Sequence, residues 1–519
     1  MEIEAMVTET VIEQNLEQFL LVLCVSLSVA TLSRVFGWFR RIPFTLLLVI
    51  VGLILAFVDI RLVSLSPELI LEIFLPPLLF EAAWNLKWKD LKRDLVPVGF
   101  FAIFGVIISV VGMAYGLNFF TGIPLAIAFL VGASLSATDP ISVVALLKEL
   151  GASKRLRTLM EGESLFNDGV AVVAFTLLVG IPLGTVDKFS ISNSLLTFIS
   201  FVGIGIGVGS LVGFGISYLT QGFDLPLVEQ SITLVSAYGT YIITEKLGGS
   251  GVIGVVTVGL IFGNFGSRIG MNPRTRLIVN EFWEFVAFFV NSIVFLLIGD
   301  QIEYTILADN IVLIVVAIGM VIITRGISVY GLSALSNLVA NSNIGLREQT
   351  LLWWGGLRGS VSIALVLSVP VVLPGRDEIT AVVFGVVLFT LLVQGLTTQP
   401  MLQILGLIGD QPLRQEYMEF IARRVALNRV LNYISELVSR QEIDREYYRS
   451  QTEILQRELK QLQEKIDHMQ AEHSQLVALE LKLLQEELVD IEVNTYAEFI
   501  LAGKLNNNVS PLLAELFEK

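Results

Sequence analysis

Long apolar segments fill residues 1–409 and constrain the fold more than any other feature of the chain. These residues hold 49 of the 82 Asp, Glu, Lys and Arg residues, about 12% of their length, whereas residues 410–519 hold the other 33, or 30%. Soluble proteins carry about 25% charged residues. The first part is therefore too apolar for a water-soluble domain, and the second is too charged to enter a bilayer. We expect an all-α, multi-pass integral membrane protein with a soluble tail.

The remaining composition excludes several classes of function. A net charge of −14 offers no basic surface to nucleic acid. Cys24 is the single cysteine, so an intramolecular disulfide and a cysteine metal cluster are both impossible. The two histidines, His468 and His473, lie in the tail. Proton chemistry inside the membrane must therefore use carboxylates, and we expect no cofactor.

Thirteen membrane spans are predicted from the apolar runs and from the polar, Gly and Pro residues between them. A membrane helix needs about 20 mostly apolar residues. The predicted spans are approximately 16–36, 43–59, 67–85, 95–118, 124–148, 158–181, 195–219, 228–246, 250–265, 279–299, 309–334, 349–372 and 378–400. Residues 410–519 follow them as a helical tail.

The distribution of Lys and Arg predicts the orientation, because cytoplasmic loops collect these residues. The N-terminal segment carries five glutamates and is placed outside. The inside loops then hold fourteen basic residues and the outside loops hold four, Arg61, Lys188, Lys246 and Arg376. This ratio supports an odd number of spans, with the N-terminus outside and the tail in the cytoplasm.

Two of the predicted spans are interrupted by residues that disfavour a continuous helix. The fifth span contains Ser136-Ala137-Thr138-Asp139-Pro140, where proline removes a backbone donor and disfavours helix for the preceding residue. The twelfth contains Gly355-Gly356-Leu357-Arg358-Gly359. Broken backbone at membrane depth is tolerated where it lines a cavity or is buried in protein. A simple proline kink is the alternative for the fifth span.

An offset of seven spans separates the two breaks, which places the second half of the membrane region upside down relative to the first. Interrupted helices at corresponding positions of inverted repeats mark the binding site of many transporters. We therefore expect spans one to six and eight to thirteen to form inverted repeats, with two interrupted helices that cross.

Polar side chains within the sixth span predict an ion site. Ser164 and Asp168 are four residues apart, as are Glu163 and Asn167, so each pair shares a helix face. Asp168 is about ten residues, or roughly 15 Å, from the cytoplasmic end of the span. Oxygen ligands of this kind suit an alkali cation. An interhelical hydrogen-bond network is the alternative.

Four further charged residues lie within spans, and two of them, Arg358 and Glu81, each allow two interpretations. Arg358 either neutralises Glu163 or offsets exposed carbonyls at the end of a half-helix. Glu81, after the Pro76-Pro77 bend, either joins the ion site from a neighbouring helix or reaches the interface near Lys87. We also single out Glu161 and Asp139 among the carboxylates inside spans, which are expensive and usually functional.

Four of these stretches together resemble the monovalent cation:proton antiporters of the NhaP/NHE type, in particular the prokaryotic ones. The matching stretches are FLPPLLFEAAW (74–84), SATDP (136–140), GESLFNDGVAVV (162–173) and WGGLRGSVSIAL (354–365). The resemblance covers about residues 15–405. It implies a fold of the NhaA/NhaP kind, a homodimer formed through the membrane domain, and a core domain that moves against a dimerisation domain.

The resemblance also implies roles for individual residues. Asp168 would bind the cation or the proton, and Asn167 would be its fixed partner. The cation site would be completed by Ser164, Glu81 and the backbone of Thr138. The structural charges of the core would be Asp139, which balances helix dipoles at the crossing, and Glu163, paired with Arg358.

The function expected from these residues is exchange of Na⁺ or Li⁺ for H⁺ by alternating access, in the plasma (inner) membrane, with roles in pH homeostasis and salt tolerance. Burial disfavours a bare carboxylate charge, so one Asp holds either a proton or a cation. One such site predicts an electroneutral 1:1 exchange. The alternatives are a K⁺:H⁺ exchanger, a carboxylate symporter, an ion channel, and an intramembrane aspartyl protease using Asp139 and Asp168.

Two further patterns concern packing and the tail. Gly205, Gly209 and Gly213 form a small-xxx-small face on the seventh span, which predicts close helix packing or a subunit contact. In the tail, apolar residues at 4-3 spacing predict a coiled coil or a helical bundle that regulates or aids dimerisation. They are Leu455, Leu459, Leu462, Ile466, Met469, Leu476 and Leu483, interrupted by His473 and Glu480. His468 and His473 could sense pH there.

Overall fold

The computed structural model describes residues 2–35, 43–58, 62, 66–183, 191–220, 225–267, 271, 273–408, 411–439 and 445–501. Within these residues the secondary structure is helical, without strands. The chain divides into two compact units, Met1–Gly409 and Asp410–Lys519. Several predicted loops that carry counted charges, among them 36–42, 59–61, 184–190 and 268–270, lie outside the described residues.

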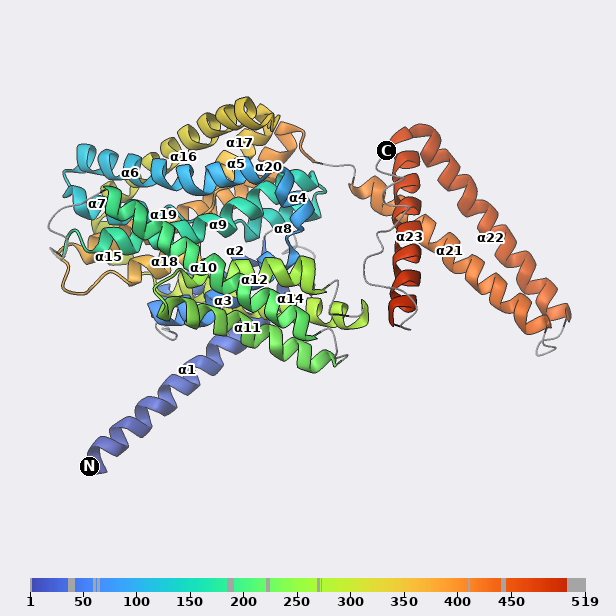
Figure 1. Ribbon diagram of the computed structural model, residues 1–519, viewed down its shortest axis with the longest axis horizontal. Helices are drawn as coiled ribbons and strands as arrows, with labels where there is room; N and C mark the ends of the chain where they lie inside the picture. The colour runs from blue at the N-terminus through green and yellow to red at the C-terminus, as the bar shows by residue number, and fades with distance from the viewer. Residues whose placement is uncertain are drawn as a thin grey trace. The chain divides into compact units, whose positions relative to one another are not determined.

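Each predicted span of the first unit coincides with one helix or with consecutive helical pieces (Figure 1). They are α1 (Glu2–Val35), α2 (Phe44–Phe57), η2 (Leu69–Phe74) with α3 (Leu75–Asn85), α5 (Leu95–Gly99) with η3 (Phe100–Gly105) and α6 (Val106–Thr121), α7 (Leu125–Ser134) with α8 (Ile141–Glu149), α9 (Lys154–Val179), α10 (Ile191–Leu219), α11 (Pro226–Lys246), α12 (Gly251–Ile261) with η5 (Phe262–Gly266), α14 (Pro273–Asp300), α16 (Ile311–Ala340), α17 (Leu346–Trp354) with α18 (Ser360–Leu367), and α19 (Arg376–Phe389) with η6 (Thr390–Gln394) and α20 (Gly395–Leu405). The short helices α4 (Trp88–Arg93) and α15 (Tyr304–Asp309) lie between them. Six of the described helices are long and apolar enough to cross a membrane on their own.

The two predicted interruptions are confirmed. Residues 135–140 separate α7 from α8, and residues 355–359 separate α17 from α18. The two breaks meet, because the backbone N–H of Asp139 donates a hydrogen bond of 2.8 Å to the carbonyl of Leu357. The proline in one break and the glycines in the other leave backbone groups without helical partners. At the crossing, each break provides hydrogen-bond partners for some of the free backbone groups of the other break.

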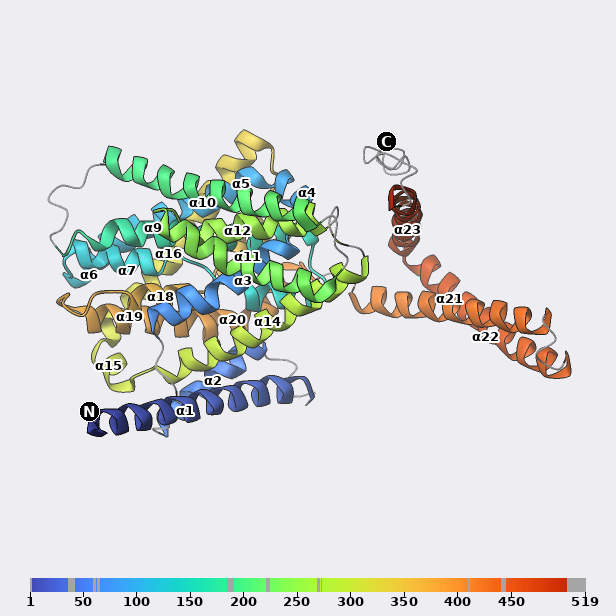
Figure 2. The same ribbon diagram turned by 60° about the horizontal axis from the view of Figure 1, so that its bottom comes forward.

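The helices of the first unit form two groups according to which elements pack on one another. One group contains α1, α2, α3, α10, α11, α12 and α14, and the other contains α5 to α9 and α16 to α20. In Figure 1 the helices α5, α6 and α16 lie on the upper side of the unit and α3, α11 and α14 on the lower side, and Figure 2 shows the same unit turned by 60°. Contacts between the groups come mainly from α9 against α12 and from α18 against η2 and α14. Both interrupted helices belong to the second group.

The glycine face of α10 packs within the chain, as the sequence predicts for close helix packing. A Cβ on Gly209 would lie 2.5 Å from the carbonyl oxygen of Gly254 and 2.7 Å from Cβ of Thr257, both on α12. A Cβ on Gly205 would lie 2.9 Å from the carbonyl oxygen of Ser250. These glycines therefore allow the two backbones to approach each other. Gly207, by contrast, has no atom of a described residue within 4 Å of its Cβ position.

The described residues of the second unit form three helices, α21 (Gln411–Ser439), α22 (Arg445–Glu472) and α23 (Ser474–Leu501). Its small core contains the buried side chains of Tyr417, Ile466 and Leu476. The 4-3 repeat therefore spans two helices, because His473 separates α22 from α23. The side chain of Leu483 lies outside the described residues.

A polar network closes this core. Glu480 accepts hydrogen bonds from Tyr417 Oη at 2.9 Å, from Arg424 Nη2 at 3.0 Å and from Gln470 Nε2 at 2.5 Å. Partial burial raises the pKa of Glu480, but these three hydrogen bonds outweigh it and hold that pKa below its ordinary value. Glu480, which interrupts the apolar repeat, thus joins all three helices of the tail.

Candidate ion-binding site at the helix crossing

A cavity of about 290 Å³ lies between the two helix groups, beside the crossing. Five of the predicted site residues line it. They are Asp168 and Ser164 from α9, Thr138 and Asp139 from the break between α7 and α8, and Glu81 from α3. The tertiary structure thus brings together residues that lie up to 87 positions apart (81 to 168). The first four come from the second helix group, and Glu81 comes from the first.

One carboxylate oxygen of Asp168 has no hydrogen-bond partner in the part of the chain that the structure describes. Its side chain is 9% exposed, and Oδ1 makes no hydrogen bond within the described part of the chain. A buried carboxylate oxygen in this state is costly unless a cation or a proton satisfies it. Asp168 is therefore poised to take a ligand from the cavity that it lines.

Ser164 and Asn167 fix the unwound residue Thr138. The Ser164 hydroxyl donates to the carbonyl oxygen of Thr138. The Asn167 amide donates from Nδ2 to Thr138 Oγ1 at 2.6 Å, and its Oδ1 accepts from the Thr138 N–H at 3.4 Å. Asn167 is 1% exposed and is absent from the cavity lining, and its described hydrogen bonds go to Thr138 rather than to Asp168. The geometry gives Asn167 a positioning contact rather than a ligand position.

Asp139 caps the second half of its interrupted helix. Its Oδ1 accepts a hydrogen bond of 3.0 Å from the N–H of Ile141, the first residue of α8. A carboxylate at a helix N-terminus interacts favourably with the helix dipole. Across the crossing, a Cβ on Gly359 would collide with the Asp139 carboxylate, so glycine at 359 lets the two breaks approach.

The predicted ion pair between Glu163 and Arg358 is wrong. Glu163 pairs with Arg325 of α16, whose Nη1 donates to Glu163 Oε1 and whose Nη2 donates to Oε2 at 2.9 Å. Arg325 also donates to the carbonyl of Leu352 at 3.0 Å. The side chains of Arg325 and Glu163 are 9% and 3% exposed, so the pair is buried. Both arginines lie within predicted spans, so the sequence alone does not distinguish them. The packing of α16 places Arg325, rather than Arg358, against Glu163.

Arg358 instead binds exposed carbonyls, the second role considered for it. Its Nη1 donates to the carbonyl oxygens of Ser136 at 3.2 Å and Ala137 at 3.0 Å, in the break after α7. The residue is 1% exposed, and its backbone N–H donates to Thr390 Oγ1 at 3.1 Å. Its positive charge thus lies where the carbonyls of the broken helix concentrate negative potential.

Glu81 accepts a hydrogen bond of 2.5 Å from Asn85 Nδ2 and lines the cavity. Five polar side chains of the lining were missed by the sequence analysis as site residues: Asn85, Lys148, Glu284, Asn291 and Ser360. Glu284 lies within the predicted span 279–299, so the charge of that span was the signal that should have identified it. Lys148 was assigned to a loop from its position.

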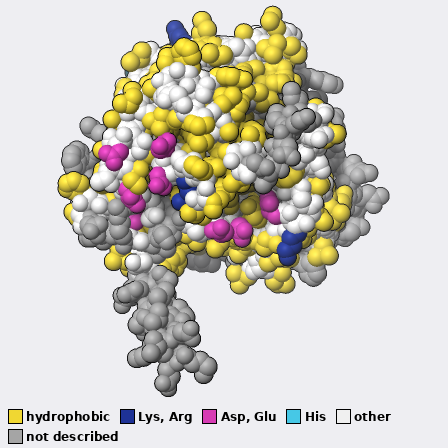
Figure 3. Space-filling view, turned by 90° about the vertical axis from the view of Figure 1, so that its left-hand side faces the viewer, with side chains coloured by type: hydrophobic (Ala, Val, Ile, Leu, Met, Phe, Trp, Pro, Cys, Tyr) yellow, Lys and Arg dark blue, Asp and Glu magenta, His cyan; other side chains and the backbone are white. Residues whose placement is uncertain are grey.

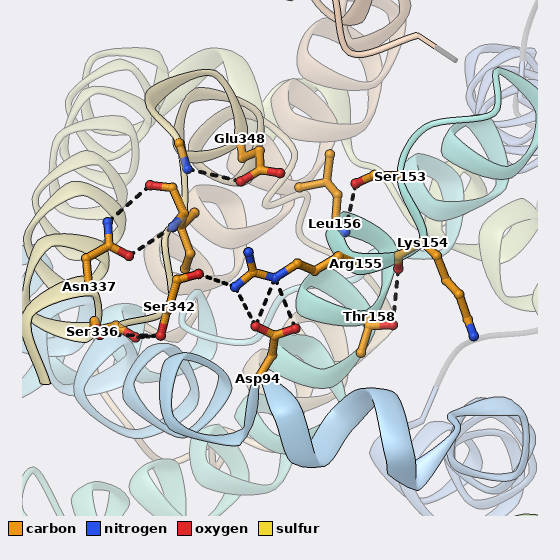
Figure 4. A network of polar contacts seen from close by, with 12 residues as sticks. Asp94, Ser153, Lys154, Arg155, Leu156, Thr158, Ser336, Asn337, Ser342 and Glu348 are labelled. Atoms are coloured by element: carbon orange, nitrogen blue, oxygen red, sulfur yellow. Dashed lines mark hydrogen bonds and ion pairs between the residues drawn. The ribbon is translucent and has the colours of Figure 1, made fainter. Parts of the chain in front are cut away.

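A second charged cluster anchors the beginning of α9 (Figure 4). Arg155 donates to both carboxylate oxygens of Asp94, with a distance of 2.7 Å from Nη2 to Oδ1, and also to the carbonyl of Ser342. Ser153 caps the helix by accepting from the N–H of Leu156 at 3.3 Å. Because Ser342 lies between α16 and α17, these contacts tie three segments together. They fix the end of the helix that carries Asp168 farther along.

Comparison with known proteins agrees with this architecture. The family described as "Sodium/hydrogen exchanger, transmembrane" matches residues 23–404. The chain is 64% identical over its whole length, and the whole length of the relative, to the Na⁺/H⁺ antiporter ApNhaP of Aphanothece halophytica. It is 59% identical, over 97% of this chain and 96% of the relative, to the low-affinity Na⁺/H⁺ antiporter NhaS1 of Synechocystis.

The solved structure of the sodium proton antiporter MjNhaP1 from Methanocaldococcus jannaschii at pH 8 shares the fold. It aligns with a TM-score of 0.62 and 21% identity, over 76% of this chain and 99% of that one. Two interrupted helices crossing beside a buried carboxylate define a membrane transporter of the broken-helix class. The chain belongs to the sodium/hydrogen exchanger family. It is a transporter rather than an enzyme, which sets the aspartyl protease interpretation aside.

Proposed function

We propose that this protein exchanges Na⁺ or Li⁺ for H⁺ across the membrane by alternating access, with no cofactor beyond the transported ions. The observation that carries the proposal is the buried Asp168 carboxylate at the crossing of the two interrupted helices, whose Oδ1 has no hydrogen-bond partner among the described residues. The names of the relatives, Na⁺/H⁺ antiporters, support the same reaction.

The cation would bind to oxygens that line the cavity. Asp168 supplies the charge, and the Ser164 hydroxyl, the Thr138 carbonyl and the Glu81 carboxylate lie on the same lining as further oxygen ligands. Such hard ligands suit small alkali cations. Asn167 and Ser164 hold Thr138 in its unwound conformation, so Asn167 acts by positioning Thr138.

Exchange follows because one carboxylate serves both ions. A buried Asp168 that is neither protonated nor cation-bound is disfavoured, so the two helix groups move past each other only with one of the two ions in place. Glu163 is neutralised by Arg325, whereas Arg358 keeps its positive charge beside the carbonyls of the break, and neither charge changes when one ion replaces the other. The moving group then carries the same charge in both directions, which makes the exchange electroneutral with one cation per proton.

The cavity opens toward the end of the unit that is rich in Lys and Arg. A smaller cavity adjoins it there, shares Asn85, Lys148 and Glu161 with it, and is also lined by Lys87, Lys154 and Arg157. The opposite end, shown in Figure 3, presents several Asp and Glu side chains and few Lys or Arg among the described residues. By the positive-inside rule, this supports an N-terminus outside, a tail in the cytoplasm and an inward-open state.

The experiment uses purified protein in vesicles that hold a proton gradient. With the wild type, addition of Na⁺ or Li⁺ should dissipate the gradient. The Asp168→Asn variant should accumulate normally in the membrane but should give no response. Dissipation by K⁺ but not by Na⁺ or Li⁺ would replace the proposal with K⁺:H⁺ exchange. A rate that changes with imposed membrane potential would refute the 1:1 stoichiometry.

The assembly and the location are part of the same proposal. We propose a homodimer that is formed through the membrane unit and located in the plasma membrane. The tail acts as a cytoplasmic regulatory element, and its removal leaves the ion site in place, because the described site residues all belong to Met1–Gly409. Crosslinking in native membranes would test the dimer.

A further inference from the structure

Lys148 is the single basic side chain among the described residues that line the ion cavity. It lies near the end of α8, the half-helix that Asp139 caps. It also lines the smaller cavity, together with Glu161 and Asn85. These three residues therefore stand where the two cavities adjoin, on the route that a cation entering from the Lys- and Arg-rich end would follow.

The ammonium group of Lys148 faces carboxylates rather than bulk water alone. Its Nζ is 3.8 Å from Glu161 Oε1, a long ion pair in which the lysine side chain is 58% exposed and that of Glu161 is 28% exposed. Glu81, one of the proposed cation ligands, lines the same cavity as Lys148. A long and partly exposed pair is weak, so the ammonium can be displaced by another cation.

A lysine ammonium and a Na⁺ ion carry the same charge, and both are attracted to carboxylate oxygens. We propose that Lys148 is a tethered cation that competes with the entering ion for Glu81 and Glu161, and thereby sets the apparent affinity of the inner side for Na⁺. This inference rests on the proposed function, because it assigns a specificity-determining residue to the same transport cavity.

Removal of the charge should strengthen binding of the cation. With Lys148→Gln, Glu81 and Glu161 lose the competing ammonium, and the KM for Na⁺ measured from the inner side should fall roughly two- to fivefold, the factor that corresponds to a partly exposed ion pair. Lys148→Arg keeps the charge and should keep the KM near that of the wild type. Glu161→Gln should raise the KM, and the double variant Lys148→Gln/Glu161→Gln should return it toward the wild-type value.

Lys154 provides a matched control. Its side chain is also 58% exposed and also pairs with an acid, with Nζ 2.6 Å from Asp90 Oδ2, but it lines the smaller cavity and is absent from the lining of the ion cavity. Lys154→Gln removes the same charge from the same end of the unit. The competition proposal predicts an unchanged KM for this variant, whereas a general effect of surface charge predicts the same fall as for Lys148→Gln.

The measurement is Na⁺-dependent dissipation of a proton gradient in everted membrane vesicles, whose outer face is the cytoplasmic side, with membrane abundance of each variant determined by immunoblot. A wild-type KM in Lys148→Gln, or the same fall in Lys148→Arg and Lys154→Gln, overturns the proposal. If Lys148→Gln does not accumulate in the membrane, the KM of the double variant is compared with that of Glu161→Gln, because these two variants also differ only in the charge at position 148. The wild type and Asp168→Asn are measured in parallel. An inactive wild type, or an active Asp168→Asn, would contradict the proposed function, whereas the KM values of the Lys148 variants test this inference alone.

Discussion

The buried pair of Glu163 and Arg325 allows a sharp test of the charge arrangement behind the ion site. Glu163→Gln removes the carboxylate that both Nη atoms of Arg325 contact and leaves the guanidinium buried. Nε of Arg325 already lacks a hydrogen-bond partner among the described residues. The remaining contact to the Leu352 carbonyl, at 3.0 Å, satisfies one donor but cannot neutralise the charge.

The expected loss follows from the burial of both side chains, which are 9% and 3% exposed. Breaking a buried pair by removing one partner costs about 3–5 kcal/mol, because the other charge remains uncompensated. Replacing both partners removes both charges and costs much less. The double variant Glu163→Gln/Arg325→Met should therefore be more stable than Glu163→Gln alone, and the two substitutions should show a coupling energy of at least about 1 kcal/mol.

The free energy of unfolding would be measured by denaturant titration in mixed micelles for the wild type, both single variants and the double variant. Arg358→Met combined with Glu163→Gln is the control, because Arg358 binds the carbonyls of Ser136 and Ala137 instead. A coupling energy that is large for Arg358 and absent for Arg325 would refute the pairing described here.

Two other expected outcomes concern helix packing and the tail. Gly209→Ala should lower the free energy of unfolding by about 1–3 kcal/mol, because its Cβ meets the Gly254 carbonyl, whereas Gly207→Ala should leave it unchanged or raise it by up to about 1 kcal/mol. An equal loss in both would contradict close α10–α12 packing. A folded-state pKa of Glu480 below its ordinary value of 4.5 means that its stabilising contribution is present above pH 4.5 and is lost as the pH falls through the folded-state pKa. Amide hydrogen exchange in α23 of the full-length protein, corrected for intrinsic rates, should therefore accelerate below about pH 4.5 in the wild type, and Glu480→Gln should lose this pH dependence.

Much of the local structure follows from the sequence because each signal is contained within a short segment. Apolar runs of roughly 20 residues predict the helices of the membrane unit, since backbone groups in lipid must be satisfied within the segment. Asp139-Pro140 and the glycines around Arg358 predict the two breaks for an equally local reason, because these residues cannot continue a helix without losing hydrogen bonds or stability. The position of the second break follows from these glycines alone, whereas the partner of Arg358 does not.

The tail shows where a local pattern is insufficient. Its 4-3 apolar spacing fits one long coiled coil as well as it fits a helical bundle. In the structure the repeat is divided between α22 and α23, with His473 between them. Glu480 appeared as an interruption of the repeat, yet it binds Tyr417 and Arg424 from another helix. Spacing defines which residues share a face of a helix, but not which helix covers that face.

By itself, the sequence determined the membrane class, the helical segments, the two breaks and the set of charged residues that the membrane makes costly, with Asp168 foremost among them. The tertiary structure decided the partners of these residues. Glu163 pairs with Arg325 rather than with Arg358, and Asn167 binds Thr138 rather than Asp168. Glu81, Glu284 and Lys148 line the same cavity as the residues of the helix crossing. The physical reason is that burial of a charge can be inferred from the apolar residues around it in the chain. The compensating charge comes from a distant helix, whose rotation and position are fixed only when the helices pack together.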